Sequence, residues 1–262
     1  MAVSSSSRLT VVVPLYRSEL SANEHISIAR CYELYAGKYD IIVVKPEGVD
    51  MTTLGEEFPA LQFIEVSPER MSSIQQYNKL LLSEDFYRLF IGYDYILIYQ
   101  ADCFVFHDTL DEWVEKGYDY VGAPWYFSLG FAAPFKRFIG RILRAMRLYH
   151  GNGFRWGEVG NGGFSLRRVQ SFIEHLQSRP SLSERAKQGR LNEDIYWSFR
   201  AKEFRKPSAP EASEFCGDMT PTLCPQNVMA AHGWNKNTAT IEFWREKIEK
   251  TGTYFVENKG DN

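Results

Sequence analysis

The sequence lacks the segments that take proteins into or across membranes. It has no run of about 18 apolar residues, so we expect no membrane-spanning helix. Residues 1–10 are rich in serine, and the apolar run Val11–Tyr16 is shorter than the apolar part of a secretory signal. No C-x-x-C pair occurs among the four cysteines, which argues against a zinc ribbon. We therefore expect a cytoplasmic protein with reduced thiols.

An excess of positive charge is also missing. Lys and Arg number 30 against 33 Asp and Glu, a net charge of −3, which disfavours a general nucleic-acid-binding protein. The sequence contains no G-x-x-x-x-G-K-[ST], G-x-G-x-x-G or G-x-S-x-G motif, so P-loop, dinucleotide-binding and α/β-hydrolase sites are not indicated. Aromatic residues, at 15%, are abundant. Such rings build cores, and they also line carbohydrate and nucleotide sites.

The first 110 residues alternate between predicted strands and helices. Continuous apolar strands separated by helices indicate a mainly parallel sheet covered on both faces. With 262 residues, the chain suits one large domain or two small ones. We predict strands at Leu9–Pro14, Tyr39–Lys45, Leu61–Val66 and Tyr93–Tyr99, and helices at Ser21–Tyr35 and Met71–Phe90, the latter with Ile74, Tyr77, Leu81 and Leu82 on one side.

The pattern changes after Asp108, where glycines and aromatic residues interrupt the apolar periodicity. The expected elements there are shorter and less regular. We predict strands at Tyr118–Ala123 and Glu214–Cys216, a Gly-rich loop at 160–166, and helices at Arg168–Gln177, Asn192–Lys202 and Ile241–Lys250.

Two polar groups follow predicted strands of the first half, at the sheet edge where ligands bind in open α/β sheets. Tyr16 and Arg17 follow the first strand. They could stack on a base and meet a phosphate, or form an ordinary surface loop. Asp102 follows the apolar fourth strand, where a carboxylate needs a partner. A divalent cation and a helix N-terminus are both suitable partners.

Three features of the second half also allow a functional and a structural interpretation. The glycines of 160–163 would let a ligand approach the backbone, or form a tight turn. Glu193 and Asp194 follow Asn192, a plausible N-cap; they suit the first turn of a helix, or supply a general base. His232 lies between small residues and is either a structural histidine or a metal ligand.

Five segments occur in this order along the chain: VVVPLY, YNKLL, YDYILIYQADCFVF, GNGGFSLR and HGW. Through these segments the chain resembles GT-A-fold glycosyltransferases, which use nucleotide-sugar donors. The chain looks most similar to a bacterial family (DUF5672-like) of uncharacterised glycosyltransferase-like proteins from polysaccharide gene clusters. The order also parallels the inverting β-1,4-galactosyltransferases. The resemblance spans residues 9–234. It implies an α/β GT-A fold with a Rossmann-like, mainly parallel sheet flanked by helices. Residues 1–108 would form the donor-binding half and 109–262 a fused acceptor-binding and catalytic half of one continuous domain.

The resemblance also implies roles for individual residues. Lys79 would approach the donor diphosphate. Asp102 matches the last Asp of the D-x-D motif and His232 a late metal ligand, which implies a divalent cation, Mn²⁺ or Mg²⁺. Gln100 departs from the pattern because it replaces the first Asp of that motif, so strict metal dependence is in question. The donor-site residues implied are Pro14, Tyr16, Arg17, Tyr77, Lys79, Gln100, Asp102, Gly162 and Gly163.

Glu193 and Asp194 match an acidic pair in which one carboxylate deprotonates the acceptor, and we favour Asp194 as this catalytic base. The function implied is an inverting, metal-assisted glycosyltransferase of the hexosyltransferase type. It would move a sugar from a nucleotide-sugar, most simply a UDP-sugar, to a glycan or lipid-linked glycan in surface polysaccharide synthesis. The alternative is a non-catalytic nucleotide- or sugar-binding protein, which the loss of an acid at Gln100 motivates. A nucleotidyltransferase is disfavoured because Pro14–Leu20 contains no glycine.

The segment Phe135–Arg147 carries five basic residues and no acidic one. Its pattern is that of a basic amphipathic helix, which can lie on an anionic membrane surface. Such a helix would place the protein at the inner face of the membrane, beside a lipid-linked acceptor. A basic, solvated face on a helix packed against the core gives the same pattern.

Overall fold

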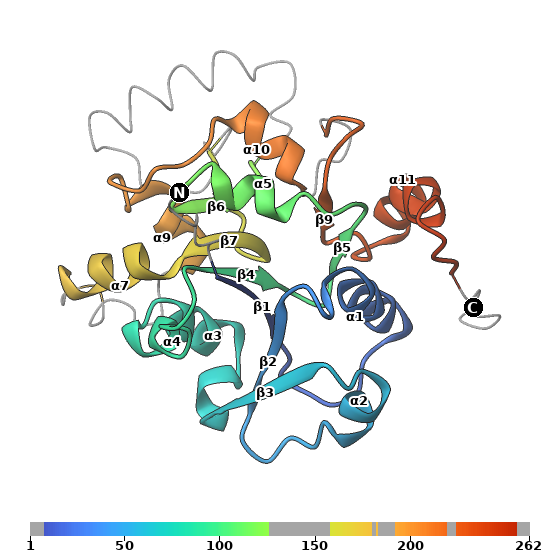
Figure 1. Cartoon of the computed structure of the whole chain (residues 1–262), viewed down its shortest axis with the longest axis horizontal. Helices are drawn as coiled ribbons and strands as arrows, with labels where there is room; N and C mark the ends of the chain where they lie inside the picture. The colour runs from blue at the N-terminus through green and yellow to red at the C-terminus, as the bar shows by residue number, and fades with distance from the viewer. Residues whose placement is uncertain (1–7, 126–157, 180–181, 183–191, 219–223, 256–262) are drawn as a thin grey trace, which may run out of the picture.

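The computed structural model describes residues 8–125, 158–179, 182, 192–218 and 224–255. Its centre is a six-stranded sheet with the order β3-β2-β1-β4-β7-β6 (Figure 1). The first four strands are parallel, and β7 runs antiparallel to both of its neighbours. The strands are β1 (Leu9–Pro14), β2 (Asp40–Pro46), β3 (Leu61–Val66), β4 (Tyr95–Tyr99), β6 (Tyr120–Gly122) and β7 (Phe164–Arg168).

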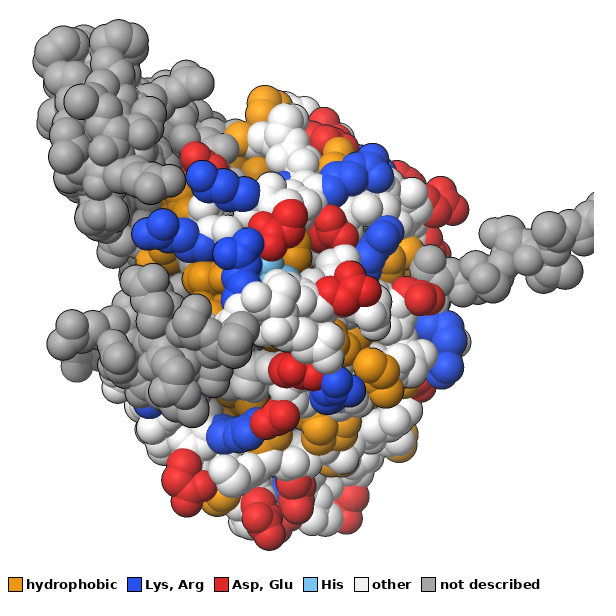
Figure 2. Space-filling model, turned by 90° about the vertical axis from the view of Figure 1, so that its left-hand side faces the viewer, with side chains coloured by type: hydrophobic (Ala, Val, Ile, Leu, Met, Phe, Trp, Pro, Cys, Tyr) orange, Lys and Arg blue, Asp and Glu red, His pale blue; other side chains and the backbone are white. Residues whose placement is uncertain are grey.

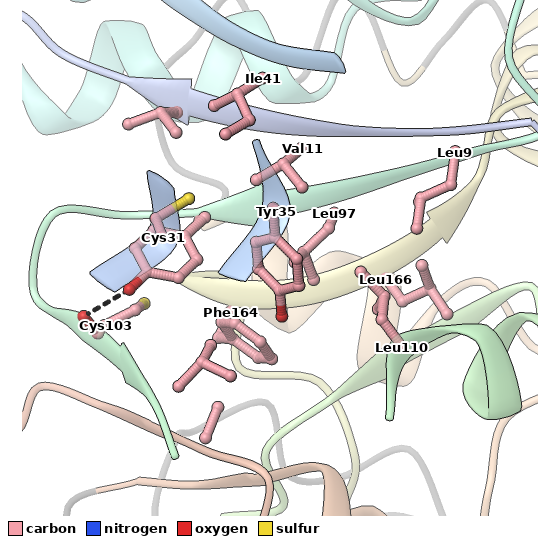
Figure 3. Packing of buried hydrophobic residues seen from close by; sticks show 14 of the residues in the cluster. Leu9, Val11, Cys31, Tyr35, Ile41, Leu97, Cys103, Leu110, Phe164 and Leu166 are labelled. Atoms are coloured by element: carbon pink, nitrogen blue, oxygen red, sulfur yellow. Dashed lines mark hydrogen bonds between the residues drawn. The ribbon is translucent and has the colours of Figure 1, made fainter. Parts of the chain in front are cut away.

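Helices cover both faces of this sheet, as the continuous apolar strands predicted. Alternate residues of β1 serve the two faces: Val11 and Val13 pack in one core cluster, and Val12 packs in the other. Figure 3 shows the first cluster, in which Cys31 and Tyr35 lie against the sheet residue Val11. The helices are α1 (Ala22–Tyr35) and α2 (Thr52–Glu57) on that face, and α3 (Ile74–Leu81), α4 (Glu84–Arg88) and α7 (Val169–Gln177) on the other.

The single helix predicted over Met71–Phe90 is wrong. The chain forms a 3-10 turn over Pro68–Met71 and then the two short helices α3 and α4. Ser83 ends the first by starting the second, because its hydroxyl accepts the N–H of Phe86 as an N-cap. Ile74, predicted on the same side as Tyr77, Leu81 and Leu82, is 83% exposed because it is the first residue of α3, beyond the core.

A small second sheet, of order β5-β9-β8, adjoins the first. β4 ends at Tyr99, where the fourth strand was predicted to end. The chain then turns at 100–102, and the next strand, β5, belongs to this second sheet. The strand predicted at Glu214–Cys216 is instead the end of a helix followed by β8. The remaining elements are β5 (Cys103–Val105), β8 (Cys216–Gly217), β9 (Ala230–His232), α5 (Leu110–Glu115), α9 (Glu193–Phe199), α10 (Ala209–Phe215) and α11 (Thr238–Glu249).

Acidic and basic side chains are interspersed over the coloured part of the face drawn in Figure 2, without a large area of one sign. Among the described residues, no helix is both long enough and apolar enough to span a membrane. The basic segment 135–147 lies outside the described residues.

Candidate active site

The turn between β4 and β5 brings Asp102 to His232. The N–H of Gln100 donates to the carbonyl of Gly163 at 3.0 Å, and the N–H of Cys103 donates back to the carbonyl of Gln100 at 2.9 Å. Cys103 then pairs directly with His232 in the small sheet. The Tyr99 hydroxyl donates to the Cys103 carbonyl at 3.1 Å, a further contact that holds this turn. Backbone contacts therefore set the position of Asp102.

His232 is at the centre of a polar cluster, which we call the Asp102 cluster (Asp102, His232, Gln100, Asp218 and Lys236). Nε2 of His232 lies 3.3 Å from Oδ1 of Asp102 and 3.4 Å from Oε1 of Gln100. Nδ1 lies 3.1 Å from Oδ1 of Asp218. Lys236 reaches Asp102 Oδ2 from the solvent side, with Nζ at 3.8 Å. The sequence analysis singled out neither Asp218 nor Lys236.

The charges of this cluster are mutually dependent. Burial alone would lower the pKa of His232, but Asp102 and Asp218 outweigh it and raise that pKa to about 9. Burial alone would raise the pKa of Asp102, but His232 and Lys236 outweigh it and hold that pKa below its usual value. Without a cation, His232 is therefore an imidazolium held between two carboxylates.

The same residues fit a divalent cation. The buried Oδ1 of Asp102 makes no hydrogen bond among the described residues, although Nε2 of His232 is near it. Two donors each about 2.1 Å from a Mg²⁺ ion and at right angles are about 3 Å apart, close to the spacing of these two atoms. Cys103 also lies within 4.8 Å of both, but burial raises the pKa of its thiol well above the usual value. A neutral thiol that donates to the Gly163 carbonyl is a poor ligand for Mn²⁺ or Mg²⁺.

Gly162 and Gly163, which we call the glycine floor, lie between the Asp102 cluster and helix α9. A Cβ atom on Gly163 would lie 2.1 Å from Nε2 of His232 and 2.8 Å from Oε1 of Gln100. A Cβ atom on Gly162 would lie 2.0 Å from Oε1 of Glu193. Side chains at either position would displace these groups. Both glycines therefore lie against residues predicted to be functional. A segment that served only as a tight turn would not need these close approaches.

Glu193 is buried and paired with Arg167. Its Oε2 lies 3.0 Å from Nη1 of Arg167 and its Oε1 accepts from Nη2 at 3.1 Å. Arg167 is fully buried on β7 and also donates to Tyr87 and Ser165. Burial raises the pKa of Glu193 despite this cation. The pair anchors the start of α9, an arrangement that the sequence analysis did not anticipate.

The start of α9 is capped from another element. Asn192 was a candidate N-cap, but its side chain makes no capping hydrogen bond. Instead, Oδ1 of Asn78 on α3 accepts the N–H of Glu193 at 2.6 Å. Asn78 belongs to the segment that the resemblance assigned to donor binding, and its observed contact is structural. Asp194, the next residue of α9, is half-buried.

A pocket of about 460 Å³ lies beyond the carboxyl ends of β1 and β4. Two exposed apolar side chains border it: Tyr16, 60% exposed, and Ile74, 83% exposed. The pocket extends to Asp102, so it joins the Asp102 cluster. Its lining is Pro14, Leu15, Tyr16, Arg17, Leu20, Glu24, Met71, Ser72, Ser73, Ile74, Tyr77, Gln100, Ala101 and Asp102.

The structure separates the predicted donor residues into two groups. Six of them line the pocket, namely Pro14, Tyr16, Arg17, Tyr77, Gln100 and Asp102. The guanidinium of Arg17 is already paired, since both oxygens of Glu24 accept from its Nη2 at 2.8 Å. The described lining does not include Lys79, Gly162, Gly163, Glu193, Asp194 or His232. Of these, Gly163 and His232 lie beside Gln100, and His232 also lies beside Asp102.

A family model described as "Protein of unknown function (DUF5672)" matches residues 60–232, about two thirds of the chain. Among curated protein sequences no match was found.

Solved structures show the fold. The galactosyltransferase LgtC, in complex with donor and acceptor sugar analogs, is 15% identical with a TM-score of 0.58, over 95% of this chain and 98% of that one. Core-mannan synthase A from Aspergillus fumigatus, in a Mn/GDP form, is 11% identical with a TM-score of 0.51. The match covers 76% of this chain and 70% of that one. Mouse xyloside xylosyltransferase 1 is 10% identical with a TM-score of 0.51, over 89% and 98%. The likeness at these identities is one of fold, and the expected GT-A fold is confirmed.

Proposed function

Because this chain belongs to the DUF5672 family and has the GT-A fold, we propose that it is a glycosyltransferase that uses a nucleotide-sugar donor. One observation carries the proposal. A pocket bordered by an exposed aromatic ring, Tyr16, leads directly to Asp102, whose buried Oδ1 lies beside Nε2 of His232. A nucleoside diphosphate needs these groups in this spatial order: an apolar surface for the base, and next to it a cation site for the diphosphate.

In this proposal the base packs between Tyr16 and Ile74, which are otherwise costly to leave exposed. The diphosphate lies at Gln100 and Asp102. Asp102 and His232 would hold Mn²⁺ or Mg²⁺, which when bound would supply positive charge to offset that of the leaving diphosphate. Lys236 adds a positive charge at the same end. Arg17 orders the pocket wall through Glu24, so we assign the charge compensation to Lys236 in preference to Arg17 and Lys79.

We assign the catalytic base to Asp194. Glu193 is held by Arg167 inside the protein, whereas Asp194 is half-buried and is the next residue of α9. As a base it accepts the proton of the acceptor hydroxyl while that oxygen bonds to the sugar. The transfer is then inverting, and an NMR assignment of the product anomer tests this directly. A product with the donor's configuration contradicts the assignment of Asp194.

The finer parts of the proposal concern substrates and organisation. We propose a UDP-hexose as the donor and a glycan or lipid-linked glycan as the acceptor, in surface polysaccharide synthesis, as the resemblance of the sequence suggests. Residues 1–108 would bind the donor, and 109–262 would bind the acceptor and supply the base. The Aspergillus relative in fold was solved with Mn and GDP, so a GDP-sugar is the first alternative to test.

Calorimetric titration of UDP, and then GDP, into the protein tests the donor site. We expect micromolar binding in Mn²⁺ that is lost in EDTA. Binding that survives EDTA would contradict the cation at Asp102 and leave charge compensation to Lys236. A protein that binds none of the nucleoside diphosphates UDP, GDP and dTDP, nor CMP, contradicts the proposal.

A non-catalytic nucleotide- or sugar-binding protein is the second candidate. Two observations favour it: Gln100 supplies no charge to the cation site, and Glu193 is engaged by Arg167. Release of UDP from UDP-sugars distinguishes the two. Slow hydrolysis without an acceptor, lost in Asp102→Asn, supports the enzyme. Tight binding with no turnover of any donor supports the binding protein.

A further inference from the structure

Asp218 contacts the ring nitrogen of His232 that does not face Asp102. Its Oδ1 lies 3.1 Å from Nδ1, and its side chain is only 8% exposed. The second oxygen is held as well, because Nδ2 of Asn161 donates to Oδ2 at 3.0 Å. Oδ1 of Asn161 accepts the N–H of Gly163 at 2.9 Å. Asp218 is thus fixed relative to the glycine floor and to His232 together.

The backbone of the small sheet does not need this contact. β8 and β9 already pair through Cys216 with Ala230 and Gly217 with Ala231. Asp218 comes after the last of these pairs, and His232 is one residue beyond the partner of Gly217. A carboxylate buried at this point for packing alone would be costly, so its position beside Nδ1 calls for a chemical reason.

We propose that Asp218 is a positioning residue that prepares His232 to bind a cation. A neutral imidazole carries one N–H. When a carboxylate accepts that N–H at Nδ1, Nε2 is left with its lone pair exposed. Here Nε2 is the nitrogen that lies beside Oδ1 of Asp102. Asp218 therefore selects the tautomer and fixes the ring plane that the cation site requires. The inference rests on the proposed function, because the cation is the same one.

The test measures Mn²⁺ affinity of the full chain by the electron paramagnetic resonance signal of free Mn²⁺. We compare wild type with Asp218→Ala, Asp218→Asn and a matched control, Asp108→Ala. Asp108 is also a partly buried carboxylate in an ion pair, but its partner is Lys38. We expect Asp218→Ala to weaken Mn²⁺ binding about 10- to 100-fold, as loss of such partners does at other metal sites. Asp218→Asn should lose less, because an amide oxygen still accepts the N–H, and the control should bind like wild type.

A second readout separates positioning from stability. Long-range ¹⁵N–¹H spectra of the Mg²⁺-loaded protein report the tautomer of His232. We expect the Nδ1–H form in wild type and a mixture in Asp218→Ala; if that variant does not fold, Asp218→Asn carries the affinity test. Unchanged Mn²⁺ affinity in the variants, with wild type binding, overturns the role of Asp218 alone. Wild type that binds no Mn²⁺ overturns this role and the proposed cation site together.

Discussion

Glu193 and Arg167 form an ion pair inside the protein, with Oε2 of the carboxylate 3.0 Å from Nη1 of the guanidinium. Arg167 lies on β7 and Glu193 begins α9, so the pair joins the sheet to the helix that carries Asp194. The guanidinium has no exposed surface and the glutamate is 5% exposed. Removing one partner therefore leaves an unpaired buried charge, whereas removing both does not.

The first prediction concerns this pair. Arg167→Met should lower the free energy of unfolding by about 3–5 kcal/mol, because Glu193 is left buried without a cation. The double variant Arg167→Met/Glu193→Leu should recover most of that loss. Urea denaturation of Arg167→Met, Glu193→Leu and the double variant measures the coupling between the two side chains. Additive losses in the double variant would show that the two charges stabilise the fold independently.

The second prediction separates the two acids of α9. Asp194→Asn should reduce transfer about 100- to 10,000-fold, since a general base contributes that much, and should leave UDP affinity unchanged. Glu193→Gln should lower stability and affect transfer less. Single-turnover rates and calorimetry of each variant provide the comparison. A reversed result, with transfer abolished only in Glu193→Gln, would move the base to Glu193.

The third prediction concerns the glycine floor. Gly163→Ala should weaken Mn²⁺ binding at least tenfold, because the new Cβ would lie 2.1 Å from Nε2 of His232 and must displace that ring. Gly92→Ala is the matched control, since its Cβ would have no neighbour closer than 4.0 Å. Mn²⁺ affinity equal to that of the control would mean that His232 does not hold the cation.

The fourth prediction follows from Gln100. Gln100→Glu keeps the size of the side chain and adds a carboxylate beside His232 and Asp102. Hard divalent cations bind more tightly to sites with more carboxylate charge, so Mn²⁺ affinity should rise by about tenfold. Titration of Mn²⁺ into the variant and wild type measures this. A fall in affinity would place the cation away from Oε1 of Gln100.

The fifth prediction concerns pH in the metal-free protein. The folded pKa of His232, about 9, lies above its ordinary value of 6.5, so protonation stabilises the folded state. This stabilisation is complete below pH 6.5 and is lost as the pH rises to 9, with a size on the order of 3 kcal/mol. Urea denaturation in EDTA at pH 6 and pH 9 should show the decrease in wild type. His232→Gln should show a smaller decrease, and an equal one would assign the effect to other groups.

The first half of the fold could be predicted because its signals are local. β1, β2 and β4 are mostly continuous apolar runs, and α1 begins at a capping box formed by Ser21 and Glu24. The sequence analysis did not predict β7. Both faces of this strand are buried, but Ser165 and Arg167 are polar, so the segment shows no continuous apolar run. β5, β8 and β9 were missed because two or three residues are too few to show a period.

The candidate site was predictable where residues follow strands, as Tyr16 and Asp102 do. The residues alone left His232 as a structural histidine or a metal ligand, and the resemblance implied the metal role. The pairing of β5 with β9 places His232 beside Asp102. No local signal marks Asp218 or Lys236, because each reaches the cluster only through the folding of the small sheet. Arg167 resembles a surface residue in the sequence, and its partner Glu193 is supplied by a helix from another part of the chain.

The insertion of β7 beside β4 has a consequence for synthesis in the cell. β4 is apolar and fully buried in the folded protein, with β7 along one edge. Roughly 65 residues separate the two strands, which at ribosomal speeds takes about 3–13 s to synthesise. During that interval the nascent chain presents β4 with an unpaired apolar edge, the kind of surface that aggregates or recruits chaperones. Expression yield should therefore depend on chaperone supply more than the stability of the finished protein suggests.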